Sequence, residues 1–337
     1  MSLEKVTVRE LAGLAGVSAA TVSRALRDHP RISVRTRTRI QNLARRIGYR
    51  PNALARALSR GRVESIGFII GRCRDPYLTL TNFYGPCLSA VSAAVEEANY
   101  NLVVFADRSE KEGVLPKMIE ERHVAGVIVA EHLDEALRRE LEDFRFPHVL
   151  VDTSERRETN CIYPRDEGAG VLAVRHLEAL GHRDIAYVNT NAEHHACTRT
   201  RLAGYLAGMA EAGLPARGGY EVRPIAERLE ELFPRRPYAT ALMCFDDDVA
   251  MEALAFLWRR HMRAPDDVSI VGVNDTPMAQ RMVPKLTTVS THAGPMGEAA
   301  CEMLLERIRS GGDVRSRVFE PTLVVRESTA AARIEVE

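Results

Sequence analysis

The sequence lacks the features that mark several classes of protein. Its six cysteines are far apart and include no C-x-x-C pair, so we expect neither a cysteine metal site nor a disulfide framework. No run of about eighteen uncharged apolar residues occurs, which excludes a membrane-spanning helix. The N-terminus leads into polar sequence rather than an apolar signal core. This predicts a cytoplasmic protein whose thiols are free and mostly buried.

Motifs for common enzyme chemistries are absent as well. A serine hydrolase would carry G-x-S-x-G, a dehydrogenase G-x-G-x-x-G and a nucleotide hydrolase a P-loop, and none of these is present. With 45% hydrophobic and 27% charged residues, the composition is that of an ordinary globular protein, and 337 residues suffice for two or three domains. We expect a protein that is not an enzyme and requires no cofactor.

Charge is balanced over the whole chain, with 46 Lys and Arg against 46 Asp and Glu, but it is unevenly distributed. Residues 1–62 hold fourteen basic side chains and three acidic ones, a net charge of +11, so the remaining residues carry −11. A basic segment joined to an acidic one indicates two modules with different partners. A run of arginines is more often a solvated helix face, but a segment with so few acids fits phosphate neutralisation better.

The basic segment is predicted to form three short helices, over residues 8–15, 19–26 and 33–47. Thr7 and Ser18 stand at N-cap positions, and Gly16 suits a left-handed turn between the first two helices. Two helices joined by a three-residue turn containing glycine are typical of the helix-turn-helix, whose second helix enters the major groove of DNA.

The residues of this segment resemble the DNA-binding head of the lac repressor (LacI/GalR) family. The motifs that carry the resemblance are, in order, VTVRELAGLAGVSAATVSRAL at 6–26, Ile32-Ser33, Arg35-Thr36-Arg37, GYRPN at 48–52 and ALARAL at 53–58. The resemblance implies a transcriptional regulator, most often a repressor, that binds a pseudo-palindromic double-stranded DNA operator as a homodimer.

Roles at the DNA follow from this resemblance. Ala19 and Ala20 begin the recognition helix and can offer only methyl contacts, so Arg24, one turn further on, is the expected reader of a guanine. Serine and threonine hydroxyls suit phosphates, whereas Val22 is expected to pack in the core. The residues expected at the DNA are Thr7, Ser18, Ala19, Ala20, Thr21, Ser23, Arg24, Arg31, Asn52, Ala55, Arg56 and Leu58.

Residues 52–59 resemble the family's hinge helix. Pro51 can end the preceding helix and Asn52 can cap this one, but a segment of about eight residues is too short for an isolated helix in water. The resemblance implies that the segment orders when two copies pack together on DNA. Leu58 then wedges between the central base pairs from the minor groove. A leucine on an ordinary core stripe is the alternative.

From Val63 onward, short apolar strands alternate with amphipathic helices, a pattern typical of a parallel α/β sheet. Two such series occur, one on each side of Cys161, and the last helix and strand are expected to return to the first half. This arrangement resembles the periplasmic-binding-protein-like core of the same family. The predicted fold class is a small all-α helix-turn-helix head plus an α/β periplasmic-binding-protein-like core of two parallel-sheet subdomains. The expected domains are the head 1–51, the hinge helix and linker 52–62, a first core subdomain of 63–162 with 291–326, and a second of 163–290.

Ligands of such sheets bind at the carboxyl ends of the strands, between the two halves. The carboxylates, amides and arginines at these ends suit a polyhydroxylated ligand, and an aromatic ring there can stack on a pyranose. The resemblance assigns effector binding to Arg201, which opens the motif RLAGY, and places a carboxylate at Asp152. The expected effector-binding residues are Tyr77, Phe83, Asp152, His195, Arg199, Arg201, Asp246 and Asn274.

Asp and Asn are exchanged relative to the family's usual pattern. The family commonly has Asn-Asp after the central strand of the second half and Asp-Asp after the next strand. This chain has Asp246-Asp247 and Asn274-Asp275 there. We therefore expect a non-standard small-molecule effector, a sugar or sugar derivative, with other metabolite classes as the alternative.

Metal binding is another possible use of Asp246-Asp247-Asp248. Three adjacent aspartates in one turn cannot all face one ion, and helix capping explains them equally well. His194 and His195 are adjacent, which is not metal-ligand spacing, so we expect no metal site.

Two other functions remain as alternatives, an extracytoplasmic sugar-binding protein and a cytoplasmic α/β enzyme or ligand-binding protein. The basic head argues against the first and the missing catalytic motifs against the second. No leucine heptads follow the last predicted strand, so we expect a dimer and no membrane partner.

Overall fold

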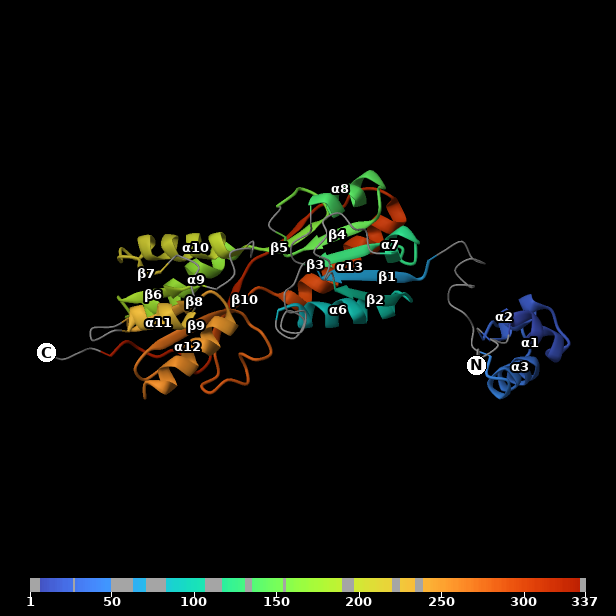
Figure 1. Cartoon of the computed structure of the whole chain (residues 1–337), viewed down its shortest axis with the longest axis horizontal. Coiled ribbons are helices and arrows are strands. Elements are labelled where there is room, and N and C mark those ends of the chain that lie inside the picture. Colours follow the sequence, from blue (N-terminus) through green and yellow to red (C-terminus); the bar gives the residue numbers. More distant parts are fainter. Residues whose placement is uncertain are drawn as a thin grey trace. The chain divides into compact units, whose positions relative to one another are not determined.

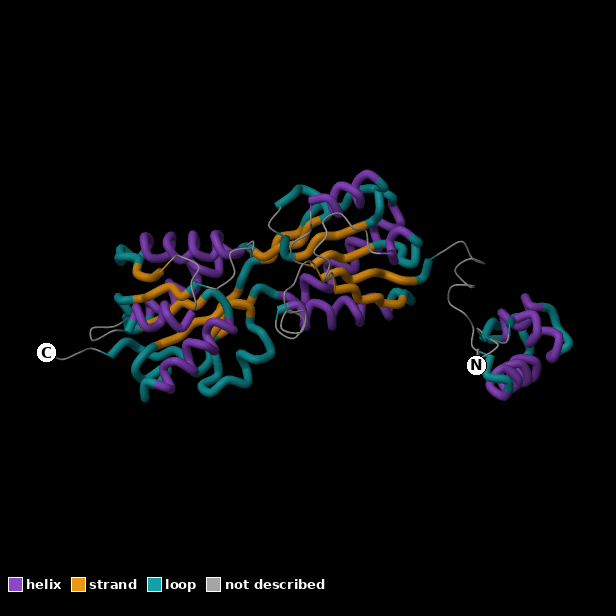
Figure 2. Tube along the Cα trace, in the orientation of Figure 1, coloured by secondary structure: helices purple, strands orange, loops and turns teal. Residues whose placement is uncertain are grey.

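The computed structural model describes residues 7–26, 28–49, 63–70, 83–106, 117–130, 135–153, 156–189, 197–219, 225–233 and 239–333. The chain divides into two compact units, Met1–Val63 and Glu64–Glu337 (Figure 1). The first unit is helical, and the second is built on two sheets (Figure 2).

The helical unit contains α1 (Val8–Ala15), α2 (Ala19–Ala25) and α3 (Val34–Arg46). Each helix begins after a hydroxyl side chain that accepts a hydrogen bond from a backbone N–H of the first turn, from Thr7, Ser18 and Ser33 respectively. Gly16 ends α1 with φ 64°, a left-handed conformation that glycine adopts without strain. The predicted helix-turn-helix is therefore present, and its small core includes Leu11, Val22 and Ile40, which are fully buried.

The first sheet of the second unit has the strand order β11-β5-β4-β3-β1-β2, with all neighbouring strands parallel. Its strands are β1 (Ser65–Ile70), β2 (Asn101–Ala106), β3 (Val127–Ala130), β4 (His148–Val151), β5 (Cys161–Pro164) and β11 (Arg317–Phe319). Alternate residues of β1 point to opposite faces of the sheet, as the strand period requires. Phe68 packs with α6 (Tyr84–Glu97) and α13 (Ala293–Ser310), whereas Ile69 packs with α7 (Lys117–Glu120) and α8 (Glu135–Asp143).

The second sheet has the order β12-β10-β9-β8-β6-β7, and only the β10–β12 pair is antiparallel. Its strands are β6 (Ile185–Val188), β7 (Arg217–Gly219), β8 (Ala241–Cys244), β9 (Ser269–Asn274), β10 (Thr287–Ser290) and β12 (Thr322–Val324). Figure 1 shows α9 (Asp166–Ala179) and α10 (Cys197–Glu211) on one side, and α11 (Ile225–Leu232) and α12 (Asp247–Arg259) on the other. The predicted parallel-sheet core with two subdomains is confirmed.

One predicted boundary is wrong. The segment 291–326 was expected to belong wholly to the first subdomain, but its last strand, β12, pairs with β10 in the second sheet. The physical reason is that the chain crosses between the subdomains once more than expected, after β11. Strand β11 completes the first sheet and has only three residues, two of them exposed, so it gives no apolar signal in the sequence.

The described helices include none that combines the length and the apolar character needed to cross a bilayer. The five cysteines of the described residues are free and buried, as expected from their spacing. They are Cys87, Cys161, Cys197, Cys244 and Cys301.

Candidate functional site

Helix α2 presents a mixed surface at its start. Ala20 and Arg24 are exposed, Ala19 is half-buried, and Val22 is fully buried against α1 and α3, as predicted. The exposed positions are one helical turn apart, so they lie on the same face of the helix. This face carries the residues expected to meet base edges.

Two of the hydroxyls expected at phosphates hold the helix ends. The Thr7 hydroxyl accepts from the Glu10 N–H at 3.2 Å, and the Glu10 carboxylate accepts from the Thr7 N–H at 2.6 Å, which completes a capping box. The Ser18 hydroxyl accepts from the Thr21 N–H at 3.1 Å and lies 2.9 Å from the Thr21 hydroxyl. The Thr7 cap thus fixes the start of α1, and the Ser18 cap fixes the start of α2.

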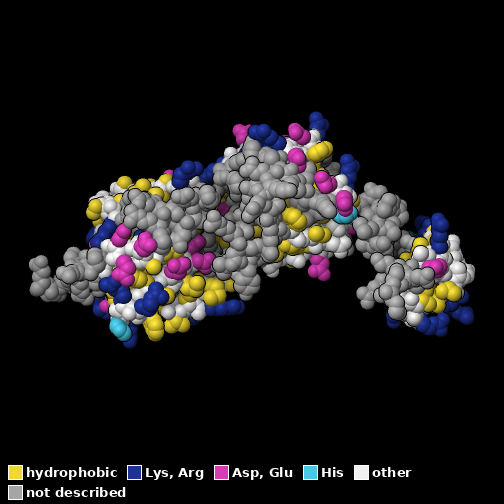
Figure 3. All heavy atoms as spheres, in the orientation of Figure 1, with side chains coloured by type: hydrophobic (Ala, Val, Ile, Leu, Met, Phe, Trp, Pro, Cys, Tyr) yellow, Lys and Arg dark blue, Asp and Glu magenta, His cyan; other side chains and the backbone are white. Residues whose placement is uncertain are grey.

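Lys and Arg side chains are visible at several places on the helical unit (Figure 3). Two arginines of α3 also bind other parts of the helical unit, α1 and the connection between α2 and α3. Arg39 donates to the Ala15 carbonyl at 3.0 Å, and Arg37 donates to the Ile32 carbonyl at 3.3 Å and pairs with Asp28. The exposed arginines among the described residues of this unit are Arg9, Arg24, Arg31, Arg35, Arg39, Arg45 and Arg46.

Several predicted site residues lie outside the described residues. These are Asn52, Ala55, Arg56 and Leu58 of the predicted hinge, and Tyr77 and His195 of the predicted effector site.

Arg201 is the centre of the polar residues at the strand ends of the second subdomain. Its side chain is 2% exposed and donates through all three nitrogens. Nε donates to Asp166 at 2.9 Å, Nη1 to the Phe245 carbonyl at 3.0 Å and Nη2 to Asn274 at 2.9 Å. A guanidinium has five N–H donors, so two remain without a partner among the described residues. The same group lies 4.8 Å from the centre of the Phe245 ring.

Asp152 is the predicted effector-site carboxylate of the first subdomain. It directly follows β4 and has a left-handed conformation, φ 57°. Tyr84 donates its hydroxyl hydrogen to the Asp152 carboxylate at 3.0 Å. Burial by itself lowers the pKa of the Arg201 guanidinium. Cys197 and the carboxylates of Asp166 and Asp152 outweigh burial and raise this pKa, so Arg201 remains charged. The charge of Asp152 therefore acts on Arg201 from the other subdomain.

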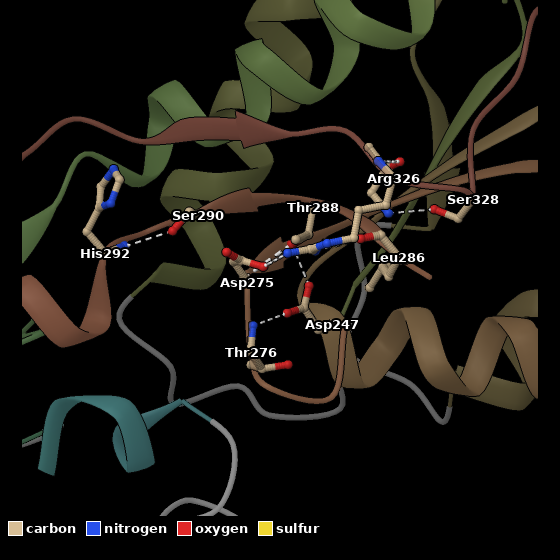
Figure 4. Close-up of polar contacts among 10 residues, drawn as sticks. Asp247, Asp275, Thr276, Leu286, Thr288, Ser290, His292, Arg326 and Ser328 are labelled. Carbon is tan, nitrogen blue, oxygen red and sulfur yellow. Dashed lines mark hydrogen bonds and ion pairs between the residues drawn. The ribbon is translucent and has the colours of Figure 1, made fainter. Parts of the chain in front are cut away.

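The three consecutive aspartates turn to different partners. Asp246 caps α12 and accepts from the Val249 N–H at 2.8 Å. Asp247 is fully buried and accepts from the Thr288 hydroxyl at 2.6 Å and the Thr276 N–H at 2.7 Å (Figure 4). Asp247 thus fastens the start of α12 to β10 and to the loop that follows β9. The described residues show no grouping of three His, Cys, Asp or Glu side chains suited to a metal ion.

Burial changes the acidity of two of these groups. Burial and the nearby Asp248 carboxylate raise the pKa of Asp246 to about 6. Burial raises the pKa of Asp247 to about 7, although the hydrogen bonds from Thr288 and Thr276 oppose the change.

A cavity of about 120 Å³ lies between the subdomains. Phe83 and Pro86 line it from the first subdomain, and Asn274 and Ser290 line it from the second. Next to it, His292 lies at one of the crossings between subdomains and is held in a left-handed conformation, φ 62°. Of the predicted effector residues, Phe83 and Asn274 line this cavity, and Arg201 binds Asn274. Arg199 is exposed on α10.

Three residues of this region were not predicted from the sequence. Asp166 pairs with Arg201, Thr291 donates to Asn274 at 3.3 Å, and Arg326 pairs with Asp275 (Figure 4 shows the last pair). The available signal was weak, since Asp166 is the first residue of a helix rather than the end of a strand, and Arg326 follows the last strand.

Two family models match the chain. The model described as "Bacterial regulatory proteins, lacI family" matches residues 7–52, and the one described as "Periplasmic binding protein-like domain" matches residues 174–329. Together they cover the helix-turn-helix and most of the second subdomain.

Relatives of similar length are transcriptional regulators. The chain is 29% identical to the HTH-type transcriptional repressor PurR of Vibrio campbellii, over 96% of this chain and 98% of that protein. It is also 29% identical to the HTH-type transcriptional regulator GalR of Escherichia coli, over 98% of this chain and 97% of the relative.

Solved structures resemble the whole chain in fold. The lac repressor dimer bound to operator and the anti-inducer ONPF is 23% identical, with a TM-score of 0.79 over 97% of this chain and 100% of that one. The transcriptional regulator CelR in complex with cellobiose is 25% identical, with a TM-score of 0.67 over 96% of this chain and 100% of the other.

Proposed function

This chain belongs to the lacI family of DNA-binding transcriptional regulators, and we propose that it is a repressor whose operator affinity is set by a small molecule. It is a regulator, not an enzyme. In this proposal a homodimer binds a pseudo-palindromic operator, and a sugar or sugar derivative binds between the core subdomains.

The helical unit supports the DNA part of the proposal. Arg24 is exposed on the second helix of the helix-turn-helix, where it can reach a guanine edge, and Ala20 can offer its methyl group to a thymine. Thr7, Ser18, Thr21, Ser23 and Arg31 are the proposed phosphate contacts. The hinge residues Asn52, Ala55, Arg56 and Leu58 are proposed from the sequence alone.

Arg201 carries the effector part of the proposal. A nearly buried guanidinium with two unassigned N–H donors, next to Asn274, is a recognition element that would be costly to maintain without a ligand. Asp152 and Asp246 add acceptors, and Phe83 adds a ring that can stack on a sugar. The relative CelR was solved with cellobiose, which favours a carbohydrate over other metabolites.

The operator can be tested by selecting random DNA duplexes on the full chain. We expect enrichment of inverted repeats with two half-sites, because a twofold dimer presents two recognition helices. Enrichment of single half-sites alone would overturn the proposed dimer.

The effector can be tested by a thermal-shift screen of mono- and disaccharides on the full chain, with Arg201→Lys as the variant. Alanine is unsuitable because it leaves the buried Asp166 carboxylate without its partner, whereas lysine keeps the charge and loses the planar set of donors. We expect Arg201→Lys to remove most of the shift caused by the best sugar while operator affinity stays within about twofold. Arg175→Lys, on the exposed side of α9, is the matched control. A full shift in Arg201→Lys at the wild-type sugar concentration would exclude Arg201 from the site.

A further inference from the structure

A second and larger cavity, of about 360 Å³, lies in the first subdomain. It lies at the amino-terminal ends of β4 and β5 and against the carboxyl-terminal end of α13. Asp152 follows the other end of β4, so this cavity and Asp152 lie at opposite ends of that strand. Its volume is within the range of about 300 to 1,000 Å³ that is usual for small-ligand sites.

The walls of this cavity are unusually rich in arginine for an acidic unit. Arg157 pairs with Glu142 at 2.5 Å, and Glu142 also accepts from Arg138 at 2.9 Å. Arg307 of α13 also lines the cavity, is mostly buried and pairs with Asp313 at 3.2 Å. Both carboxylates are therefore neutralised by arginines, so they do not prevent an anion from binding.

Arg145 adds a positive charge to this cavity. It is exposed, lines the cavity, and has no ion-pair or side-chain hydrogen-bond partner among the described residues. The charged residues that line the cavity are three arginines (Arg145, Arg157 and Arg307) and two carboxylates (Glu142 and Asp313), an excess of one positive charge. Residues 63–337 as a whole carry a net charge of −11, so the net charge of this cavity is opposite in sign to that of the segment that contains it.

His148 supplies an acceptor on the same wall. Its Nδ1 lies 2.8 Å from the Phe146 carbonyl oxygen, which can only accept, so Nδ1 carries the hydrogen and Nε2 carries the lone pair. Nε2 has no partner among the described residues. Burial and the charge of Arg307 lower the pKa of His148 to about 4, which keeps the ring neutral near pH 7. The side chain is only 3% exposed, so a ligand hydroxyl is a suitable donor to it.

We propose that this cavity is a second ligand site, which takes a small oxyanion that also carries a hydroxyl group, such as a phosphate monoester or a hydroxycarboxylate. Arg145 and Arg157 bind the oxyanion, since guanidinium groups match the geometry of phosphate and carboxylate oxygens. His148 accepts from the hydroxyl. The site does not depend on the proposed function of the other cavity, because it shares no lining residue with it.

The site also touches helix α13 and strand β4. Helix α13 begins at Ala293 beside that cavity and ends at Ser310, next to the glycines that line the second one. Strand β4 runs from His148 to the residue before Asp152. A ligand in this cavity would therefore lie against two rigid elements. Asp152 follows the other end of β4, and the other end of α13 lines the cavity between the subdomains.

The test is titration calorimetry on the full chain with inorganic phosphate, glycerol 3-phosphate and malate, at constant ionic strength. Arg145→Ala is the test variant and Arg122→Ala is its matched control. Both arginines are exposed, follow a helix of the same subdomain and have a left-handed backbone, φ 48° and 50°, but Arg122 does not line the cavity. We expect saturable binding of at least one of the three anions to the wild type and to Arg122→Ala. Its Kd should be about tenfold weaker in Arg145→Ala, as for the loss of one charge-assisted contact.

Comparing the three anions separates phosphate esters, free phosphate and hydroxycarboxylates as sources of the oxyanion. The proposal fails if none of the three binds saturably below about 10 mM. It fails equally if the two alanine variants bind with the same Kd, because the binding would then be a general effect of surface charge.

Discussion

Asp247 shows how one side chain can join two elements and also make stability depend on pH. Its carboxylate is fully buried and links α12 to Thr276 and Thr288. Burial raises its pKa to about 7, well above the value of about 4 in an unfolded chain. The folded protein therefore holds a proton on Asp247 that the unfolded chain has released.

We predict that the core unit, Glu64–Glu337, becomes less stable as the pH rises and this proton is lost. Between about pH 4 and pH 7 the folded state binds one more proton at Asp247, so each pH unit costs about 1.4 kcal/mol of unfolding free energy. The stabilisation is complete below pH 4 and is lost as the pH passes through 7. From pH 5.5 to pH 7 the loss is about 2 kcal/mol, measured by urea denaturation of the wild type against Asp247→Asn.

Asp247→Asn removes the titration but keeps a side chain that can accept from the Thr276 N–H and donate to the Thr288 hydroxyl. Its stability should therefore change less with pH than that of the wild type. Glu298→Gln, at an exposed position of α13, is the control and should follow the wild type. Parallel curves for wild type and Asp247→Asn would show that Asp247 is ionised in the folded protein.

Sequence patterns identified individual polar residues of the candidate site better than the contacts between them. Arg201 and Asn274 were both predicted, because one opens a family motif and the other ends a strand. The salt bridge between Arg201 and Asp166 was not predicted, because it joins two helices and depends on how closely those helices pack. No local pattern of residues reports that distance.

At the scale of elements, glycines set the distance between α9 and α10. A Cβ on Gly204 of α10 would lie 2.0 Å from the Glu167 carbonyl oxygen of α9, and one on Gly170 would lie 2.4 Å from the Tyr205 nitrogen. The backbones of α9 and α10 therefore touch, which only residues without a side chain allow. This contact brings the Asp166 carboxylate within 2.9 Å of Arg201.

We predict that Gly204→Ala separates α9 from α10 and destabilises the core unit by about 3 kcal/mol or more, because backbone atoms cannot move aside as a flexible side chain would. The measurement is thermal or urea unfolding. Gly294→Ala is the control, since the nearest atom to its Cβ would lie 4.0 Å away, and we expect a change of less than about 1 kcal/mol. A Gly204→Ala variant as stable as Gly294→Ala would mean that the two helices tolerate a wider spacing.

Elements with strong apolar periodicity were predicted well, and short edge elements were not. Strand β7 consists of Arg-Gly-Gly and β11 has three residues, so neither carries the apolar run that reveals a strand. Helix α11 could have been found, because Ile225, Leu229 and Leu232 follow helical spacing and are buried. The crossing of the chain from the first subdomain to the second after β11 could not have been found in this way. It depends on which sheet the short strands β11 and β12 join.

At the scale of the whole molecule, the two compact units have opposite charge. Net charges of +11 over residues 1–62 and −11 over the remainder cancel in the whole chain. A polyanion is nevertheless attracted by the first segment and repelled by the second. An acidic core repels DNA, so we expect phosphate contacts to be confined to the basic residues of the first segment. Neutral composition therefore says little about DNA binding in this chain.

The salt dependence of DNA binding tests this division of charge. Each phosphate contact releases counterions, so the logarithm of the binding constant falls with the logarithm of salt concentration by about 0.9 per contact. We expect Arg45→Gln with Arg46→Gln, two exposed arginines at the end of α3, to weaken binding to specific and random duplexes alike and to reduce the slope by about one to two. Arg259→Gln, exposed on α12 of the acidic unit, should change neither quantity, because the net negative charge of that unit is expected to repel DNA. If Arg259→Gln reduced the slope as much as the α3 double variant, DNA would also contact the core, and the separation of charge would not determine where the protein binds.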